Sequence, residues 1–207
     1  MYADNIAAIR EFLVSTDRFM PGCYFFIELI VRKKDFPEGE CGHDHQICAT
    51  YFVSSPEKFD AVIPEIKALC HLHNARAYIN LNRKSMFRTS YILMHELLEV
   101  IENGCHSTVF SRMTSAAGKC PGEKTGKTFL VDVDTDDEDV FNCVYSGVLA
   151  CAGTVHAQLR TPSGGWHLVT SPFNTKQFME LVAEHKDVVE LKHNSPTVLY
   201  YGGYGDA

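Results

Sequence analysis

The sequence predicts an α+β fold, in the broad sense of strands and helices that share one core. Two observations predict it: short apolar runs with strand periodicity alternate with amphipathic helical segments, and no segment repeats. The chain has 207 residues, of which 45% are apolar and 22% charged, so it can bury a substantial core. We expect one domain over 1–207, with 1–105 and 106–207 as two possible lobes.

The first part of the N-terminal lobe is predicted to contain one helix and two strands. The helix covers residues 5–15, where apolar side chains recur at helical spacing. The near-continuous apolar run 24–31 indicates a buried strand. A loop with proline and glycine follows it, and a second strand is expected at about 46–53.

The rest of this lobe is predicted to contain two helices and one strand. Ser55 is a typical N-cap and Pro56 a typical first helical residue, so a helix begins there and extends to Cys70. Residues 75–81 form a third strand. A long helix over 88–103 ends at a glycine.

The C-terminal lobe is predicted from the same patterns. A short helix near 106–116 leads through a loop rich in lysine and glycine to a strand at 128–133. Two further helices are expected near 137–151 and 174–185. Four more strands are expected, and we pair the last two with each other: 154–160, 166–170, 188–192 and 197–201.

Asp132 and Asp134 lie on the same face of the strand 128–133, because side chains in a strand repeat every two residues. Carboxylates this close repel each other unless a positive charge compensates them, and a hard divalent cation with oxygen ligands does so well. The alternative is a strand that ends in a polar loop, since residues 136–139 continue the acidic run as a helix cap and first turn.

A glycine-rich hairpin is the second candidate site. Gly164 and Gly165 allow the backbone to approach a ligand closely, and Arg160, Ser163 and His167 flank them. Turn amides together with these side chains suit a polyphosphate. The alternative is an ordinary hairpin with His167 in the core.

A basic cluster follows the third strand, and it suits a single nucleic-acid strand because aromatic residues are interleaved with it. The alternative is a solvated loop between a strand and a helix. The net charge of −7 argues that any nucleic-acid binding comes from a local patch of this kind. The cluster consists of Arg76, Arg83, Lys84 and Arg88.

Cysteine usage indicates reduced thiols in a cytoplasmic protein, because eight cysteines are scattered at uneven intervals. No apolar run is long enough to span a membrane, and the N-terminus lacks the features of a signal peptide. Cys41, His43, His45 and Cys48 are zinc-type ligands within eight residues. They could bind zinc, or form a hairpin loop whose Cys48 points into the core.

Taken together, three motifs resemble the archaeo-eukaryotic primase superfamily, also called the primase-polymerase group. That family has an Asp-x-Asp strand motif, a glycine-rich Ser…His motif often preceded by Thr-Pro, and an acidic residue that ends a later strand. The order and approximate spacing agree over about 125–201, and little of the first hundred residues takes part. The three segments here are Val131-Asp132-Val133-Asp134, Thr161-Pro162-Ser163-Gly164-Gly165-Trp166-His167 and Val188-Val189-Glu190-Leu191-Lys192.

The resemblance implies an RRM-like catalytic core with a mixed or antiparallel sheet and a second α/β lobe. It implies a nucleotidyltransferase that binds nucleoside triphosphates, a DNA or RNA template or primer and two divalent metal ions, Mg²⁺ or Mn²⁺. Replication partners such as a helicase would fit this role. The alternatives are an inactive relative that keeps the fold and binds nucleotide or single-stranded nucleic acid, and an interaction domain in which the three motifs are coincidental.

The resemblance also implies roles for single residues. Asp132, Asp134 and Glu190 would be catalytic and hold the metals, with Asp187 as an alternative to Glu190. Ser163, Gly164, Gly165, His167, Arg160 and Lys192 would contact the nucleotide. The family usually has aspartate where this chain has Glu190.

Overall fold

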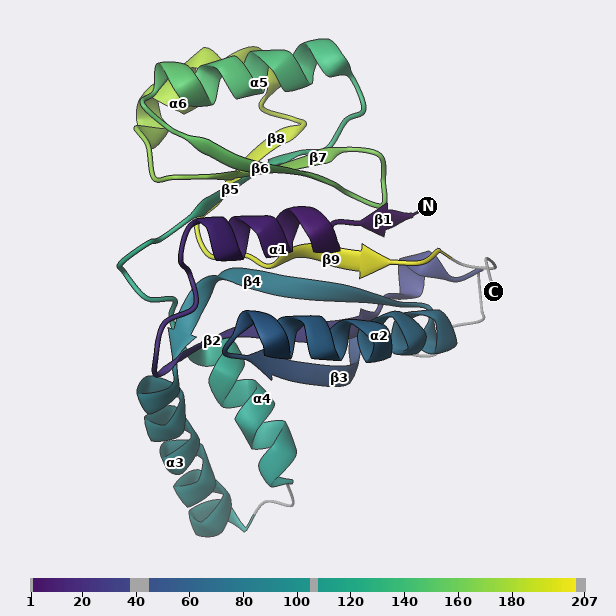
Figure 1. The fold of residues 1–207 in the computed structure, drawn as a ribbon, viewed down its shortest axis with the longest axis vertical. Helices are drawn as coiled ribbons and strands as arrows, with labels where there is room; N and C mark the ends of the chain where they lie inside the picture. Colours follow the sequence, from purple (N-terminus) through teal and green to yellow (C-terminus); the bar gives the residue numbers. More distant parts are fainter. Residues whose placement is uncertain (1, 38–44, 105–107, 204–207) are drawn as a thin grey trace.

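The computed structural model describes residues 2–37, 45–104 and 108–203, which form two antiparallel sheets and six α-helices (Figure 1). This confirms the α+β class. The five-stranded sheet has the order β1 (Ala3–Asp4), β9 (Thr197–Tyr201), β4 (Ala75–Ser85), β2 (Cys23–Val31) and β3 (Gln46–Val53). The four-stranded sheet has the order β6 (Val155–Arg160), β7 (Trp166–Thr170), β5 (Phe129–Val133) and β8 (Val189–Lys192).

The helices begin where the sequence places capping residues. Ser55 accepts a hydrogen bond from Lys58 N, and Asn174 accepts one from Gln177 N, so each satisfies a backbone donor of the first turn. The helices are α1 (Ile6–Ser15), α2 (Pro56–His73), α3 (Met86–Asn103), α4 (Val109–Lys119), α5 (Glu138–Ala150) and α6 (Thr175–Leu181), with 3₁₀ turns at Lys33–Asp35 and Ala183–His185.

The pairing expected between the last two strands is wrong. β8 pairs with β5 in the four-stranded sheet, whereas β9 lies between β1 and β4 in the five-stranded sheet. The chain therefore crosses from one sheet to the other after Lys192. The two lobes proposed at residue 105 stay a prediction, although β9 comes from the C-terminal part and joins the sheet built mainly by the N-terminal part.

β4 separates apolar from polar side chains by strict alternation. Ala75, Ala77, Ile79 and Leu81 face the main core, while the residues between them are polar and face the other way. The strand extends four residues beyond the predicted end at Leu81. These residues stay buried because Asn82 bonds to Thr128 and Lys84 bonds to carbonyls of the α4 C-terminus.

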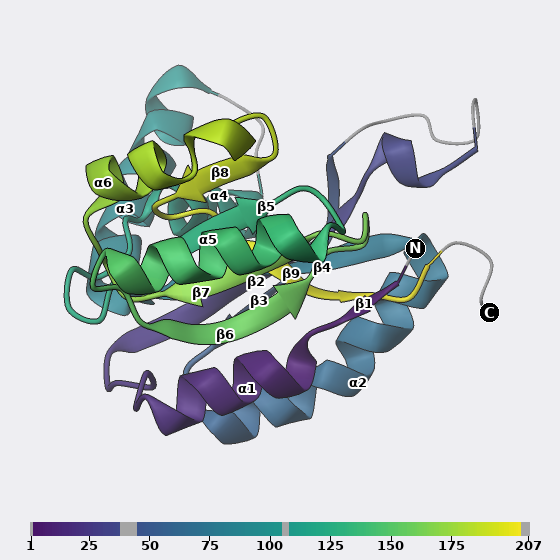
Figure 2. The same ribbon diagram turned by 90° about the horizontal axis from the view of Figure 1, so that it is seen from above.

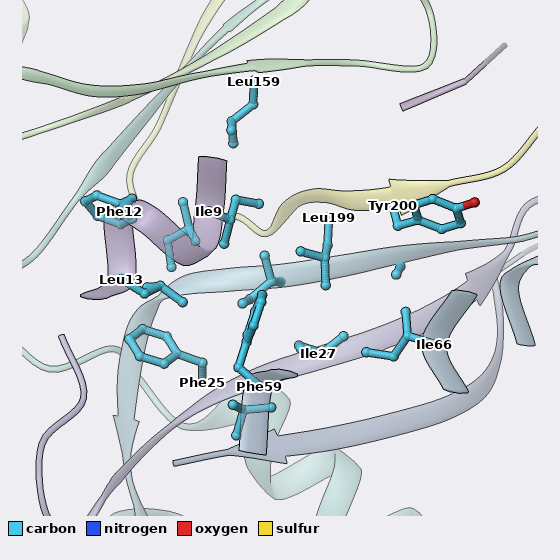
Figure 3. Close-up of a cluster of buried hydrophobic side chains, with 14 of the residues drawn as sticks. Ile9, Phe12, Leu13, Phe25, Ile27, Phe59, Ile66, Leu159, Leu199 and Tyr200 are labelled. Carbon is cyan, nitrogen blue, oxygen red and sulfur yellow. The ribbon is translucent and has the colours of Figure 1, made fainter. Parts of the chain in front are cut away.

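The main core joins both sheets through α1. Figure 3 shows Ile9 of α1 between Leu159 of β6 and side chains of the five-stranded sheet, and Phe59 of α2 packs against the same sheet. A second core lies between the four-stranded sheet and the helices α5 and α6, which Figure 2 shows lying over that sheet. Both sheets therefore pack against helices, and α1 contributes to the core that they share.

None of the helices in the described part of the chain has both the length and the apolar character needed to cross a lipid bilayer. The described cysteines are all unpaired: Cys23, Cys48, Cys70, Cys120, Cys143 and Cys151. Cys41 and His43 of the possible zinc site lie outside the described residues. Cys48 donates to the carbonyl of Leu29 at 3.5 Å.

The core predicts a large difference between two substitutions on α2. Phe59 is fully buried, so Phe59→Ala should lower the free energy of unfolding by about 3–5 kcal/mol. Leu72 on the same helix is 74% exposed, and Leu72→Ala should change it by about 0.5 kcal/mol or less. Urea unfolding at neutral pH measures both. Equal effects would contradict the packing described here.

Candidate functional site

Three residues of the predicted site stand side by side across the four-stranded sheet. In the antiparallel register, Asp132 of β5 is opposite Glu190 of β8 on one side and opposite His167 of β7 on the other. Their side chains share one face of the sheet, because the alternate residues Val131 and Val133 are buried against α5 and α6 on the opposite face. The sheet thus brings together residues that are about 60 positions apart in the chain.

Asp132 lies at the centre of this row and contacts side chains from both neighbouring strands. Its Oδ2 lies 2.5 Å from Lys192 Nζ and its Oδ1 lies 3.2 Å from His167 Nε2, while Lys192 Nζ also lies 3.3 Å from Glu190 Oε2. Burial by itself would raise the pKa of Asp132, but its bonds to His167 and Lys192 outweigh burial and lower that pKa to about 2. Asp132 is therefore charged at neutral pH.

Lys192 neutralises the two carboxylates. Burial favours its neutral form, but the hydrogen bonds and charges of Asp132 and Glu190 prevail and raise its pKa. Acidic side chains directly opposite each other in a sheet destabilise it unless a cation compensates them. The Lys192 ammonium supplies that cation.

His167 is buried but not sealed in an apolar layer. Its Nδ1 lies 2.7 Å from Thr197 Oγ1, and its Nε2 faces Asp132. A neutral ring that donates from Nε2 to Asp132 can accept the Thr197 hydroxyl proton at Nδ1. Both ring nitrogens are thereby satisfied, and one edge of the ring lines a cavity.

The hairpin between β6 and β7 lies beside Asp134. Ser163 Oγ donates to Asp134 Oδ1 at 3.4 Å and lies 3.0 Å from Thr161 Oγ1. Gly164 has a φ of +99°, which favours glycine. A Cβ atom on Gly165 would lie 2.3 Å from the carbonyl oxygen of Val133, so only glycine permits this approach of the hairpin to β5.

A polar cavity of about 200 Å³, open to solvent, lies between this face and the five-stranded sheet. The cavity receives side chains from both sheets and from the hairpin. Its lining residues are Arg32, Lys34, Arg76, Tyr78, Asp132, Asp134, Thr161, Pro162, Ser163, His167, Lys192, Pro196 and Val198.

Arg32, Lys34 and Arg76 form a cationic wall on the side of this cavity that belongs to the five-stranded sheet. Arg76 pairs with the buried Asp35, and Arg32 donates to the hydroxyl of Tyr78 at 3.2 Å while its Nε is buried and makes no hydrogen bond. Burial first, and then the charges of Arg32 and Arg76, lower the pKa of Lys34. An anion in the cavity would relieve this repulsion.

The sequence did not single out Arg32 and Lys34, because cations at the end of a strand usually mark only its exposed end. Their proximity to the acidic row depends on the packing of the two sheets, which no local pattern reveals. The sequence pattern that could have pointed to them is a run of three basic residues, Arg32 to Lys34, directly after a buried strand.

Arg160 does not reach the cavity, which corrects its predicted contact with a nucleotide. Its guanidinium lies over the Trp166 ring at 3.0 Å from the centroid and donates to the carbonyl of Gly164 at 3.1 Å. The Trp166 ring packs against Phe141 of α5, so Arg160 lies on the opposite face of the sheet from Asp132.

The four basic residues predicted to bind nucleic acid do not share a surface. Lys84 is buried and donates to the carbonyls of Ala117 and Cys120, where the negative end of the α4 dipole favours a cation. Arg83 is also buried, so both predictions need correction. Arg88 is exposed with its NH1 3.9 Å from Glu123, and Arg76 belongs to the cationic wall.

The carboxylates fit a divalent cation by their chemistry. Asp132, Asp134 and Glu190 line an adjoining hollow together with Asp187, and hard oxygen donors are the ligands that Mg²⁺ and Mn²⁺ prefer. Within the described residues, no three acidic, histidine or cysteine side chains converge tightly enough to hold a metal in this conformation. The Lys192 ammonium is the cation between Asp132 and Glu190, and a metal there would have to displace it.

Comparison with known proteins found no similarity: no family model matches the chain, and neither a curated protein nor a solved structure does.

The pKa of Asp132 predicts a pH-dependent part of the stability. This pKa falls from an ordinary 3.8 to about 2 on folding, so the contribution is complete above pH 4–5 and is lost as the pH falls towards 2. With allowance for solvent screening it amounts to about 1–2 kcal/mol. Urea unfolding measures the difference in free energy of unfolding between the wild type and Asp132→Asn. This difference should narrow by about 1–2 kcal/mol as the pH falls from about 5 towards 2.

Asp139→Asn, at an exposed position in the first turn of α5, is the control, and its difference from the wild type should change less. A constant difference for Asp132→Asn at all pH values would contradict the paired carboxylate.

Proposed function

We propose that the protein is a metal-dependent nucleotidyltransferase of the primase-polymerase type, which adds nucleotides from nucleoside triphosphates to a nucleic-acid 3′-hydroxyl. The row Glu190–Asp132–His167 in register on one sheet face, opposite the cationic wall, is the observation that carries this proposal. Acidic residues suited to metals and basic residues suited to phosphates meet there at one cavity.

The four-stranded sheet supports the proposal through its element order. Strand, helix, two strands, helix and strand follow one another as β5-α5-β6-β7-α6-β8, with the spatial order β6-β7-β5-β8. This is the βαββαβ arrangement of ferredoxin-like and RRM domains. It suits an RRM-like core, because the acidic row lies on the sheet face opposite to α5 and α6.

Each residue has a role in this proposal. Asp132, Asp134 and Glu190 would hold the metals, and Asp132 suits this task because its low pKa keeps it ionised. Bound divalent cations supply activation of the attacking hydroxyl and stabilise the leaving pyrophosphate. Ser163 lines the cavity where the phosphates would lie, and Gly165 allows its hairpin to pack closely against β5.

His167 and the cationic wall would bind the triphosphate. His167 is held in orientation by Thr197 and can donate from Nε2 to a phosphate oxygen in place of Asp132. Arg32 and Lys34 face the same cavity and would neutralise the phosphates. Lys192, once released from Asp132, lies within the same lining and adds a further positive charge.

The second candidate is a catalytically inactive protein that keeps this fold and binds a nucleotide or single-stranded nucleic acid. One observation favours it: the Lys192 ammonium bridges Asp132 and Glu190, which offsets one of their two negative charges without any metal. In this case the cationic wall would still bind phosphates.

Metal binding and nucleotide incorporation separate the two candidates. Calorimetric titration with Mn²⁺ should show a site that Asp132→Asn/Asp134→Asn abolishes and Asp139→Asn retains. Primer extension with labelled nucleotides should follow the same pattern. Unchanged Mn²⁺ binding in the double variant would rule out this metal site, and nucleotide binding without incorporation on any template would favour the binder.

The cationic wall gives a separate prediction that does not require activity. Arg32→Ala/Lys34→Ala should weaken the binding of a nucleoside triphosphate about tenfold or more, because a hydrogen bond to a charged group contributes about 1.5–3 kcal/mol. Lys33 is exposed between them and does not line the cavity, so Lys33→Ala is the matched control. Calorimetry with and without Mn²⁺ measures the nucleotide affinity of both variants. Equal affinities would show that the cationic wall does not bind the nucleotide.

A further inference from the structure

Helix α3 presents its apolar residues to solvent and its polar residues to the protein. Thr89 and Glu96 are its buried residues. Five large apolar side chains, called the α3 stripe here, are exposed instead: Phe87 (81%), Tyr91 (59%), Met94 (63%), Leu98 (54%) and Ile101 (76%). Monomeric proteins rarely expose so many contiguous large apolar side chains without a partner for them.

The buried side of α3 fixes this orientation. Glu96 accepts hydrogen bonds from Lys119 at 2.7 Å and Ser115 at 2.9 Å, both on α4. The Thr89 hydroxyl lies 2.7 Å from the hydroxyl of Tyr24 on β2. Rotation of the helix to bury the stripe would break these polar contacts, so the apolar face stays outward.

The spacing of the stripe suits another helix. Its members are separated by four, three, four and three residues, which is the a/d pattern of a helix that packs along its length against a second one. At 100° per residue they span an arc of about 80°. The 18 residues of α3 make it about 27 Å long, and Figure 1 shows α3 and α4 projecting together from the end of the five-stranded sheet.

The charges beside the stripe select the partner and its direction. Arg88 lies near the start of α3, and Glu99 and Glu102 lie near its end, all on one flank of the stripe. In an antiparallel pair with its two-fold axis near Met94, Arg88 faces the partner's Glu99 and the partner's Glu102. A parallel pair would bring no opposite charges together in this way.

We propose that the α3 stripe is the interface of a two-fold symmetric homodimer in which two α3 helices pack antiparallel. The stripe offers roughly 400 Å² of apolar surface per copy, at about 60–120 Å² for each large side chain. A standard interface buries about 800 Å² per partner. The dimer is therefore weak, with a dissociation constant in the micromolar range.

Sedimentation velocity from low micromolar to several hundred micromolar protein tests the dimer. The wild type should shift from monomer to dimer over this range. Leu98→Glu should raise the dissociation constant about a hundredfold, because both copies carry the buried charge. Leu72→Glu, at an exposed apolar position on α2, should leave it unchanged. Thermal unfolding shows that each variant remains folded.

Charge reversal tests the antiparallel direction. Arg88→Glu and the double variant Glu99→Lys/Glu102→Lys should each weaken the dimer several-fold, and all three changes together in one chain should restore it, because both sides of each charge pair are then reversed. Failure to restore the dimer would overturn the antiparallel arrangement.

Three results would overturn the homodimer. These are a wild type that stays monomeric at every concentration, a dimer that Leu98→Glu does not weaken, and a monomer that sediments with phosphatidylcholine vesicles through the stripe. The last would assign the stripe to a lipid surface. None of these results bears on the proposed nucleotidyltransferase site, because no residue of α3 lines its cavity.

Discussion

Two carboxylates lie directly opposite each other on the last two strands of the four-stranded sheet, β5 and β8, and the side chains around them compensate their repulsion. Glu190 and Asp132 are paired residues of β8 and β5, and Lys192 sits between their oxygens. His167 approaches Asp132 from the other neighbouring strand. The proposed metal site depends on this acidic pair.

Local sequence patterns predicted most elements and the shared face of Asp132 and Asp134, whereas the joint site with His167 and Glu190 came only from the resemblance, and no pattern predicted how distant strands pair. The apolar alternation of β5, β7 and β8 is visible in the sequence, and it places Asp132, His167 and Glu190 on polar faces. Whether 188–192 pairs with 197–201 or with β5 depends on packing between sheets, and short sequence separation favoured the wrong partner.

The errors among the basic residues have the same origin. Arg160 is paired with Trp166 in the β6–β7 register. Because side chains alternate between the two faces of a strand, the Arg160 side chain lies on the face covered by α5. Lys84 has the composition of a surface residue, but its partners are carbonyls more than thirty residues away. In α3, helical periodicity predicted a helix and gave no sign that its apolar side faces outward. The polar contacts of Glu96 with α4 decide that.

The position of Lys192 has a consequence for whether this sheet needs a divalent ion in order to fold. Many small domains that assemble around an ion remain unfolded until the ion arrives, and chelators denature them. Here the counter-charge for Asp132 and Glu190 is encoded two residues from Glu190 itself, so this sheet can fold in a medium stripped of divalent ions. Folding therefore does not require the proposed metal, and the polypeptide can be purified and stored in a chelating buffer with its architecture intact.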